Sequence, residues 1–98
     1  MYKAIILPLA KEDIREAARW YSKKQKGLGE KFANEIREKV HFIRQNPKAS
    51  NVRYDGVRTA VLNVFPFMVH YTIDENNKTI IVSAVLHTSR NPEIWKNR

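Results

Sequence analysis

Three residues in the second half of the chain carry side chains suited to phosphodiester chemistry. His87 closes an apolar stretch, and histidine is the side chain that most readily takes or gives a proton near neutral pH. Arg58 and Arg90 carry guanidinium groups, whose planar fork of donors matches phosphate oxygens. RNA cleavage without a metal needs a base near the ribose 2′-OH, an acid for the leaving oxygen and cations around the phosphorus. We therefore take these three residues as catalytic candidates for a ribonuclease.

Each candidate also has a simpler interpretation. A histidine at a strand end can hydrogen-bond a neighbouring turn, and an arginine can form a surface ion pair or bind a carboxylate of a partner protein. Both roles stay open for His87, Arg58 and Arg90.

The sequence predicts no metal and no cofactor. It contains no cysteine, and His41, His70 and His87 show no spacing typical of metal ligands. A thiolate site and a disulfide are both excluded by this composition.

The net charge of +8 is unevenly distributed. The first fifty residues hold twelve lysines and arginines against six acidic residues, whereas the remainder hold six against four. A basic surface of this kind attracts nucleic acid or an acidic protein over long range. Charge alone does not choose between these partners, and solubility is the simpler explanation of it.

The first half of the chain predicts one strand and two helices. Tyr2–Leu7 is a compact apolar run before a proline, which indicates a strand. Leu9–Lys24 and Gly29–Gln45 carry apolar residues on one helical face, and a glycine-containing link joins them. Asn46-Pro47 ends the second helix, because proline disfavours α geometry in the residue before it.

The second half predicts three strands in an antiparallel meander. A turn at Asp55-Gly56 precedes strands over Arg58–Val64, Phe67–Asp74 and Ile80–Leu86. The expected order is β-α-α-β-β-β, an α+β fold in which the helical hairpin packs on one face of a small, mainly antiparallel sheet.

The length of 98 residues predicts a single domain spanning 1–98, because no linker-like stretch divides it. The apolar run at the start, Ala4–Ala10, is too short for a membrane span and is best explained as a first strand. We therefore expect a cytoplasmic protein with no membrane partner.

Several sequence features, in this order and spacing, resemble the RelE/ParE superfamily of toxins. The resemblance covers essentially the whole chain and is strongest in the second half. The features are Tyr2-Lys3-Ala4-Ile5-Ile6, Asp13-Ile14, Trp20-Tyr21, Phe32, Glu35-Ile36, Asn46-Pro47, Arg58, Phe65-Pro66-Phe67-Met68-Val69-His70-Tyr71, Val85-Leu86-His87-Thr88-Ser89-Arg90-Asn91-Pro92 and Trp95.

This resemblance implies the toxin of a bacterial type II toxin–antitoxin module, a growth inhibitor of the kind used in plasmid stabilisation, silenced by a cognate antitoxin. Members similar to ParE inhibit DNA gyrase, whereas members similar to RelE cut messenger RNA on the ribosome. The chain departs from the nuclease type, because it has no lysine between Lys48 and Lys78 and no tyrosine after Tyr71. We favour the gyrase inhibitor and keep the ribosome-dependent endoribonuclease as the alternative.

The strand pattern also predicts a partner-binding surface. Met68, Ile81 and Val85 are expected on the sheet face that the helices leave uncovered, with Arg58 and Arg90 at its rim. An acidic antitoxin segment with an apolar side, folding as it binds, would suit such a surface.

Two further features have competing interpretations. Lysines 23, 24, 26 and 31 cluster about the helix link, where a hydrated helix end is the simpler explanation and nucleic-acid contact the alternative. Trp20 and Trp95 are expected to anchor the core or a lid, because a large aromatic ring covers much of a thin sheet.

Overall fold

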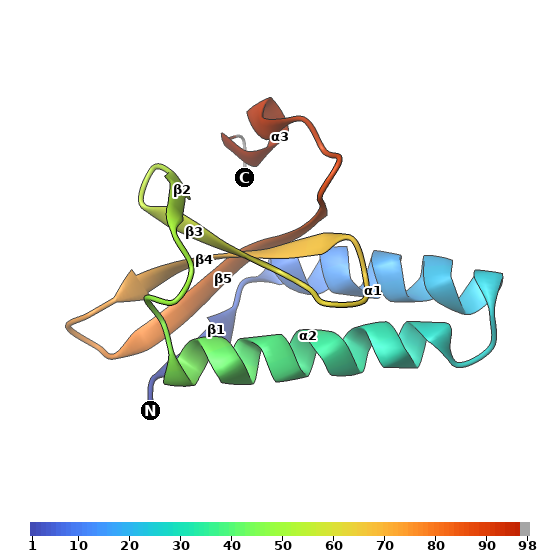
Figure 1. The fold of residues 1–98 in the computed structure, drawn as a ribbon, viewed down its shortest axis with the longest axis horizontal. Coiled ribbons are helices and arrows are strands. Elements are labelled where there is room, and N and C mark those ends of the chain that lie inside the picture. The colour runs from blue at the N-terminus through green and yellow to red at the C-terminus, as the bar shows by residue number, and fades with distance from the viewer. Residues whose placement is uncertain (97–98) are drawn as a thin grey trace.

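The computed structural model describes residues 1–96, which form a five-stranded sheet with helices on both faces. The helices are α1 (Pro8–Lys24), α2 (Leu28–Gln45) and α3 (Pro92–Lys96). The strands are β1 (Lys3–Ile6), β2 (Val52–Tyr54), β3 (Val57–Val61), β4 (Phe67–Asp74) and β5 (Thr79–His87). Figure 1 shows α1 and α2 side by side on one side of the sheet and α3 on the other.

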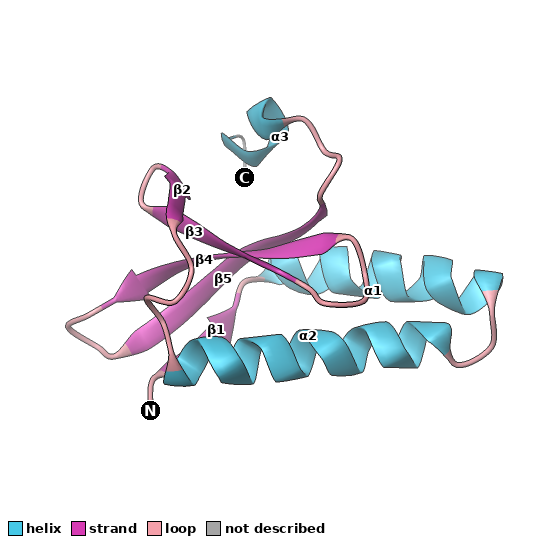
Figure 2. Cartoon of the chain, viewed as in Figure 1, coloured by secondary structure: helices cyan, strands magenta, loops and turns pink. Residues whose placement is uncertain are grey.

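The predicted α+β class, the order of the main elements and the helical hairpin on one sheet face are confirmed. The strand order in space is β1-β5-β4-β3-β2, with antiparallel pairs throughout except β1 and β5, which are parallel. Two elements were not predicted: the short edge strand β2 and the terminal helix α3, both visible in Figure 2. The second predicted strand, Arg58–Val64, corresponds to β3, which begins at Val57 and ends already at Val61.

Local sequence explains where the helices begin and end. Pro8 occupies the first turn of α1, where its missing N–H costs nothing, and Lys23 and Lys24 lie in the last turn, where positive charge is favourable. Gly27 precedes α2 with a φ of 84°, a left-handed conformation that glycine adopts without strain. The two helices are therefore joined by a sharp link.

The main core lies between the hairpin and the sheet. Phe32, Ile36 and Ile43 of α2 are almost fully buried against Tyr71 and Val82 of the two central strands. Phe32 also packs at ring-centroid distances of 5.0 to 5.2 Å on the phenylalanines at positions 65 and 67. This aromatic group joins the hairpin to the start of β4.

A second, smaller apolar cluster lies on the opposite face of the sheet. Trp95 of α3 is only 7% exposed and covers Met68, Ala84 and Leu86. The sheet is therefore a central layer with a core on each side. The face predicted to be uncovered is covered at this end.

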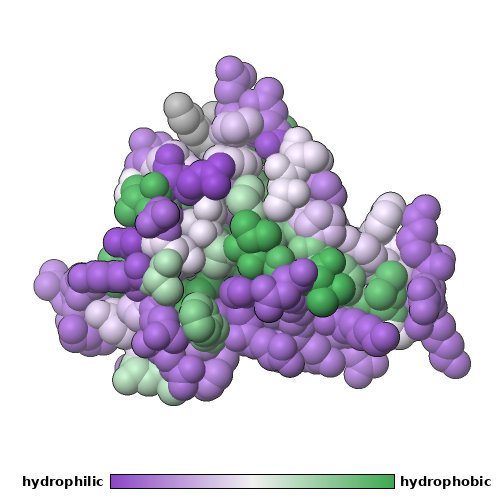
Figure 3. Space-filling model, in the orientation of Figure 1, coloured by the Kyte–Doolittle hydropathy of each residue, from purple (hydrophilic) through white to green (hydrophobic). Residues whose placement is uncertain are grey.

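The space-filling view shows how the polar surface is distributed. In Figure 3 hydrophilic residues cover the outer side of the hairpin and the far end that carries the helix link, while apolar residues gather near the middle of the visible face. None of the helices among residues 1–96 combines the length and apolar character that a membrane span requires.

Candidate functional site

A cleft of about 540 Å³ lies between helix α1 and the end of strand β5. We call it the α1 cleft. Its lining is aromatic and apolar over most of its surface, with two acidic and two basic side chains. The lining residues are Asp13, Glu16, Ala17, Trp20, Tyr21, Pro66, Phe67, Val85, Leu86, His87 and Arg90.

The end of β5 is exposed to the cleft because β1 leaves the sheet early. The N–H of Leu7 donates to the carbonyl of Val82, and the chain then turns into α1. Beyond that point the edge of β5 has no strand beside it. Asp13 of α1 takes the place of a strand there, because its carboxylate accepts the N–H of Val85 at 3.0 Å.

His87 and Arg90 lie close together at one wall of the cleft. The Nδ1 atom of His87 is 3.0 Å from the donating N–H of Ser89 and 2.7 Å from its hydroxyl oxygen, and the His87 ring is 5.2 Å from that of Phe67. Arg90 follows in a turn in which its N–H donates to the carbonyl of His87. These contacts with Ser89 hold the Nδ1 edge of the His87 ring in the turn.

The opposite wall carries two aromatic rings. Trp20 is 55% exposed, and its ring lies 5.0 Å from that of Tyr21. The expectation that Trp20 anchors the core is therefore wrong, whereas that for Trp95 is confirmed. Burial of the Tyr21 hydroxyl raises its pKa above the ordinary value, because it disfavours the charged form.

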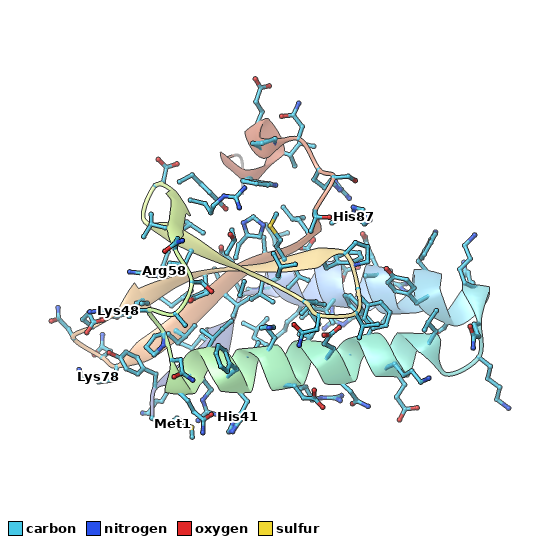
Figure 4. All side chains as sticks on the ribbon, viewed as in Figure 1. Met1, His41, Lys48, Arg58, Lys78 and His87 are labelled. Carbon is cyan, nitrogen blue, oxygen red and sulfur yellow. The ribbon has the colours of Figure 1, made fainter. Side chains whose placement is uncertain are left out.

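Arg58 lies apart from the cleft. It is paired with Tyr71 across β3 and β4, so its side chain is on the hairpin side of the sheet, and its guanidinium donates to the carbonyl of Ser50. His87 is paired with Phe67, which lies four residues from Tyr71 along β4, and it belongs to β5 at the opposite edge of β4 from β3. The backbones of Arg58 and His87 are therefore separated by about 13 Å along the strands and about 10 Å across them. Figure 4 shows Arg58 and His87 on separate parts of the molecule.

The three catalytic candidates are therefore not gathered around one phosphate. Arg58 is held toward β2 by the carbonyl of Ser50, away from β5. Only His87 and Arg90 share a cleft. Among residues 1–96, no three histidine, aspartate or glutamate side chains lie close enough together to hold a metal ion.

The predicted apolar partner surface needs a correction at Val85. This residue packs in the main core on the hairpin side and borders the α1 cleft, whereas Ala84 and Leu86 face α3. The cause is an irregularity in β5: Tyr71 pairs with Val82 but His70 pairs with Ala84, so Ser83 is left between them and the alternation shifts by one residue.

The other residues of that surface lie on the predicted face but are less accessible than expected. Met68 is only 3% exposed beneath Trp95, and Ile81 is partly buried. Ile81 is paired with Ile5 of β1, which is 51% exposed. Arg58 is on the hairpin side, so it does not join Arg90 in a rim around this face.

Comparison with known proteins assigns the family. Residues 4–92 match the model of the ParE toxin of the type II toxin–antitoxin system parDE. No curated protein sequence matches the chain.

Several solved structures share the fold. One from the chromosomal ParDE toxin–antitoxin system of P. aeruginosa has a TM-score of 0.74 and 23% identity, with coverage of 89% of this chain and 96% of that one. The intact RelBE complex of E. coli gives 0.66 and 14% identity, covering 92% and 100%, and the isolated E. coli RelE toxin gives 0.65 and 13%, covering 99% and 95%. By the match over residues 4–92, this chain belongs to the ParE toxin family of type II toxin–antitoxin systems.

Proposed function

We propose that this toxin inhibits DNA gyrase and is held inactive by a cognate acidic antitoxin. The observation that carries the choice of target is the separation of Arg58 from His87 and Arg90. Metal-free RNA cleavage needs an acid, a base and cations within hydrogen-bond reach of one phosphodiester. A toxin that acts by binding needs no such group, and the family match supports the ParE side.

The α1 cleft is the binding site in this proposal. It offers apolar and aromatic surface, with Trp20 half exposed and Arg90 at the margin. Tryptophan and arginine are the side chains that most often dominate binding energy at protein interfaces. A side chain of gyrase with an apolar body and an acidic neighbour would fit both features.

The antitoxin would silence the toxin by covering the same cleft. The apolar side of an acidic segment would pack on the aromatic wall, and one of its carboxylates would pair with Arg90. The positive net charge of the chain attracts such a segment over long range. Ile81 with Ile5 offers further apolar surface at the edge of the sheet. Gyrase, and also the mRNA that the alternative nuclease would cut, are intracellular. The proposed function therefore implies a cytoplasmic location.

An assay with purified proteins tests the target. Wild-type toxin should block supercoiling of relaxed plasmid DNA by gyrase, and it should leave mRNA intact in a translation reaction with ribosomes. Arg90→Glu should weaken inhibition by at least about ten-fold, which corresponds to about 1.4 kcal/mol of binding.

The matched control is Arg37→Glu, the same charge change at an exposed position of α2 outside the cleft. It should inhibit gyrase like the wild type. New mRNA 5′ ends with unaffected supercoiling would overturn the proposal in favour of the nuclease.

A further inference from the structure

The end of the hairpin at which α1 and α2 are linked is strongly basic. Between positions 19 and 31 the chain has five basic residues and one acidic residue, Glu30. The basic residues are Arg19, Lys23, Lys24, Lys26 and Lys31, and all five are exposed. We call this segment the hairpin tip. It carries an excess of four positive charges, half of the net charge of +8.

The tip projects away from the rest of the molecule. Helices α1 and α2 have 17 and 18 residues and are each about 26 Å long. Figure 1 shows the link between α1 and α2 beyond the edge of the sheet. A long, rigid ligand can therefore reach the tip without contacting the sheet.

The lysines of the tip are not neutralised within the described part of the chain. The ion pairs of Lys48 and Lys78 with Glu75 lie at the far end of the molecule, and Glu12 pairs with Arg15 and Arg19. None of the four tip lysines takes part in an ion pair with residues 1–96. Lys24 instead lies 4.9 Å from the centroid of the Trp20 ring, which keeps its charge and restricts its motion.

The composition of the tip favours a polyanion over a protein partner. Protein interfaces have an apolar, aromatic centre from which lysine is depleted. The two aromatic residues of the tip, Trp20 and Tyr21, line the α1 cleft. The six residues at its end, 22–27, contain no apolar side chain, and three of them are lysines. A nucleic-acid backbone is bound well by such a surface, because each ammonium group displaces a condensed counterion from a phosphate.

We infer that the hairpin tip is a contact site for the phosphate backbone of DNA, independent of base sequence. The inference rests on the proposed function, in which gyrase holds DNA beside the toxin. Trp20 borders the α1 cleft and touches Lys24 of the tip, so the protein-binding site and the DNA contact are adjacent. The toxin then binds gyrase through the cleft and the enzyme's DNA through the tip.

Binding to a labelled 20-base-pair duplex, measured by fluorescence anisotropy without gyrase, tests the inference. The wild type should bind with an affinity that falls as salt rises. The triple variant Lys23→Gln, Lys24→Gln, Lys26→Gln should bind at least about ten-fold more weakly at about 50 mM salt. Its plot of log affinity against log salt should be shallower by about 0.9 for each phosphate that the variant no longer neutralises.

The control has the same net charge. Lys11→Gln, Lys48→Gln, Lys78→Gln removes three exposed lysines outside the tip, two of them at the opposite end of the molecule in Figure 4. It should keep wild-type affinity within about two-fold. Both triple variants should remain folded with only a small shift of the thermal midpoint. All six lysines are exposed, and their ion pairs and helix-end positions each contribute about 1 kcal/mol or less.

Equal weakening in the two triple variants, or none in the tip variant, would overturn the inference, and so would a clear preference for duplex RNA over DNA. A gyrase assay with the same proteins separates the two proposals. If the wild-type toxin inhibits gyrase and the tip variant still binds DNA fully, the inference about the tip is wrong and the proposed target is supported. If only the tip variant binds DNA more weakly and the wild-type toxin does not inhibit gyrase, the DNA contact of the tip is supported and the proposed target is contradicted.

Discussion

At the scale of single residues, Glu35 shows how one carboxylate can stabilise a loop. It extends from α2 to the connection between β3 and β4, where it accepts the N–H groups of Asn63 at 2.7 Å, Val64 at 3.2 Å and Phe65 at 3.4 Å. These amides belong to a connection with little regular structure, so no strand satisfies them. The same loop places Phe65 against Phe32 in the core and leads through Pro66 to the α1 cleft.

Glu35→Ala is expected to lower the free energy of unfolding by about 2 kcal/mol, because hydrogen bonds to a charged acceptor are stronger than neutral ones. Urea denaturation followed by circular dichroism measures the change. Glu38→Ala is the control, since this exposed glutamate on the same helix has no hydrogen bond or ion pair to residues 1–96. Its effect should stay within about 0.5 kcal/mol. Equal effects of the two variants would contradict the role of Glu35.

At the scale of elements, the hairpin depends on a close approach of its two helices. Gly29 in the first turn of α2 lies against α1, and a Cβ atom added there would be 2.1 Å from the Ser22 hydroxyl oxygen and 2.3 Å from the carbonyl oxygen of Ala18. The serine side chain can rotate away, but the carbonyl belongs to the helix backbone. Only glycine therefore allows the helices to meet at this point, within the hairpin tip.

Gly29→Ala is expected to destabilise the protein by about 1 kcal/mol. Alanine favours a helix over glycine by about 1 kcal/mol, so a stabilising effect would follow from helix propensity alone. The clash with Ala18 should reverse that sign, since overpacking typically costs about 1 to 3 kcal/mol. The thermal midpoint reports the change, with the exposed position Asn34→Ala as a control on the same helix. A higher midpoint for Gly29→Ala would show that the helices can separate at little cost.

At the scale of the whole molecule, the sheet has an apolar cluster on each face, and the smaller cluster depends on one residue. Trp95 lies with its ring 5.5 Å from that of Tyr54 and 5.1 Å from that of His70, and the guanidinium of Arg53 is 5.5 Å from its centroid. Helix α3 has only five residues, so it cannot be stable without this packing. Trp95 thus attaches the end of the described chain to the face opposite the hairpin.

Trp95→Ala should cost about 3 kcal/mol of stability and expose Met68 and Leu86, which increased binding of an apolar dye would report. The chain contains its own control, because Trp20 is 55% exposed whereas Trp95 is 7% exposed. Trp20→Ala should cost no more than about 1 kcal/mol while weakening gyrase inhibition. A larger drop in stability for Trp20→Ala than for Trp95→Ala would contradict the assignment of the two tryptophans.

The sequence by itself determined the helices, the central strands and the basic tip. The apolar period of the two helices and the alternation in Phe67–Asp74 are local patterns, and they identify the face that each element buries whatever its partner. Charge can likewise be counted before folding. For these reasons the α+β order was predicted correctly, and so was the covering of one sheet face by the hairpin.

Only the tertiary structure decided which face Val85 occupies and which candidates share a site. The shift at Ser83 arises from the pairing of β5 with β4, and a pairing irregularity leaves no mark on the strand's own sequence. The three residues of β2 are too few for an alternating pattern, and α3 is held by contacts distant in sequence. Arg58 is separated from His87 and Arg90 because strand order and register are set by the whole sheet, in which β3 and β5 flank β4.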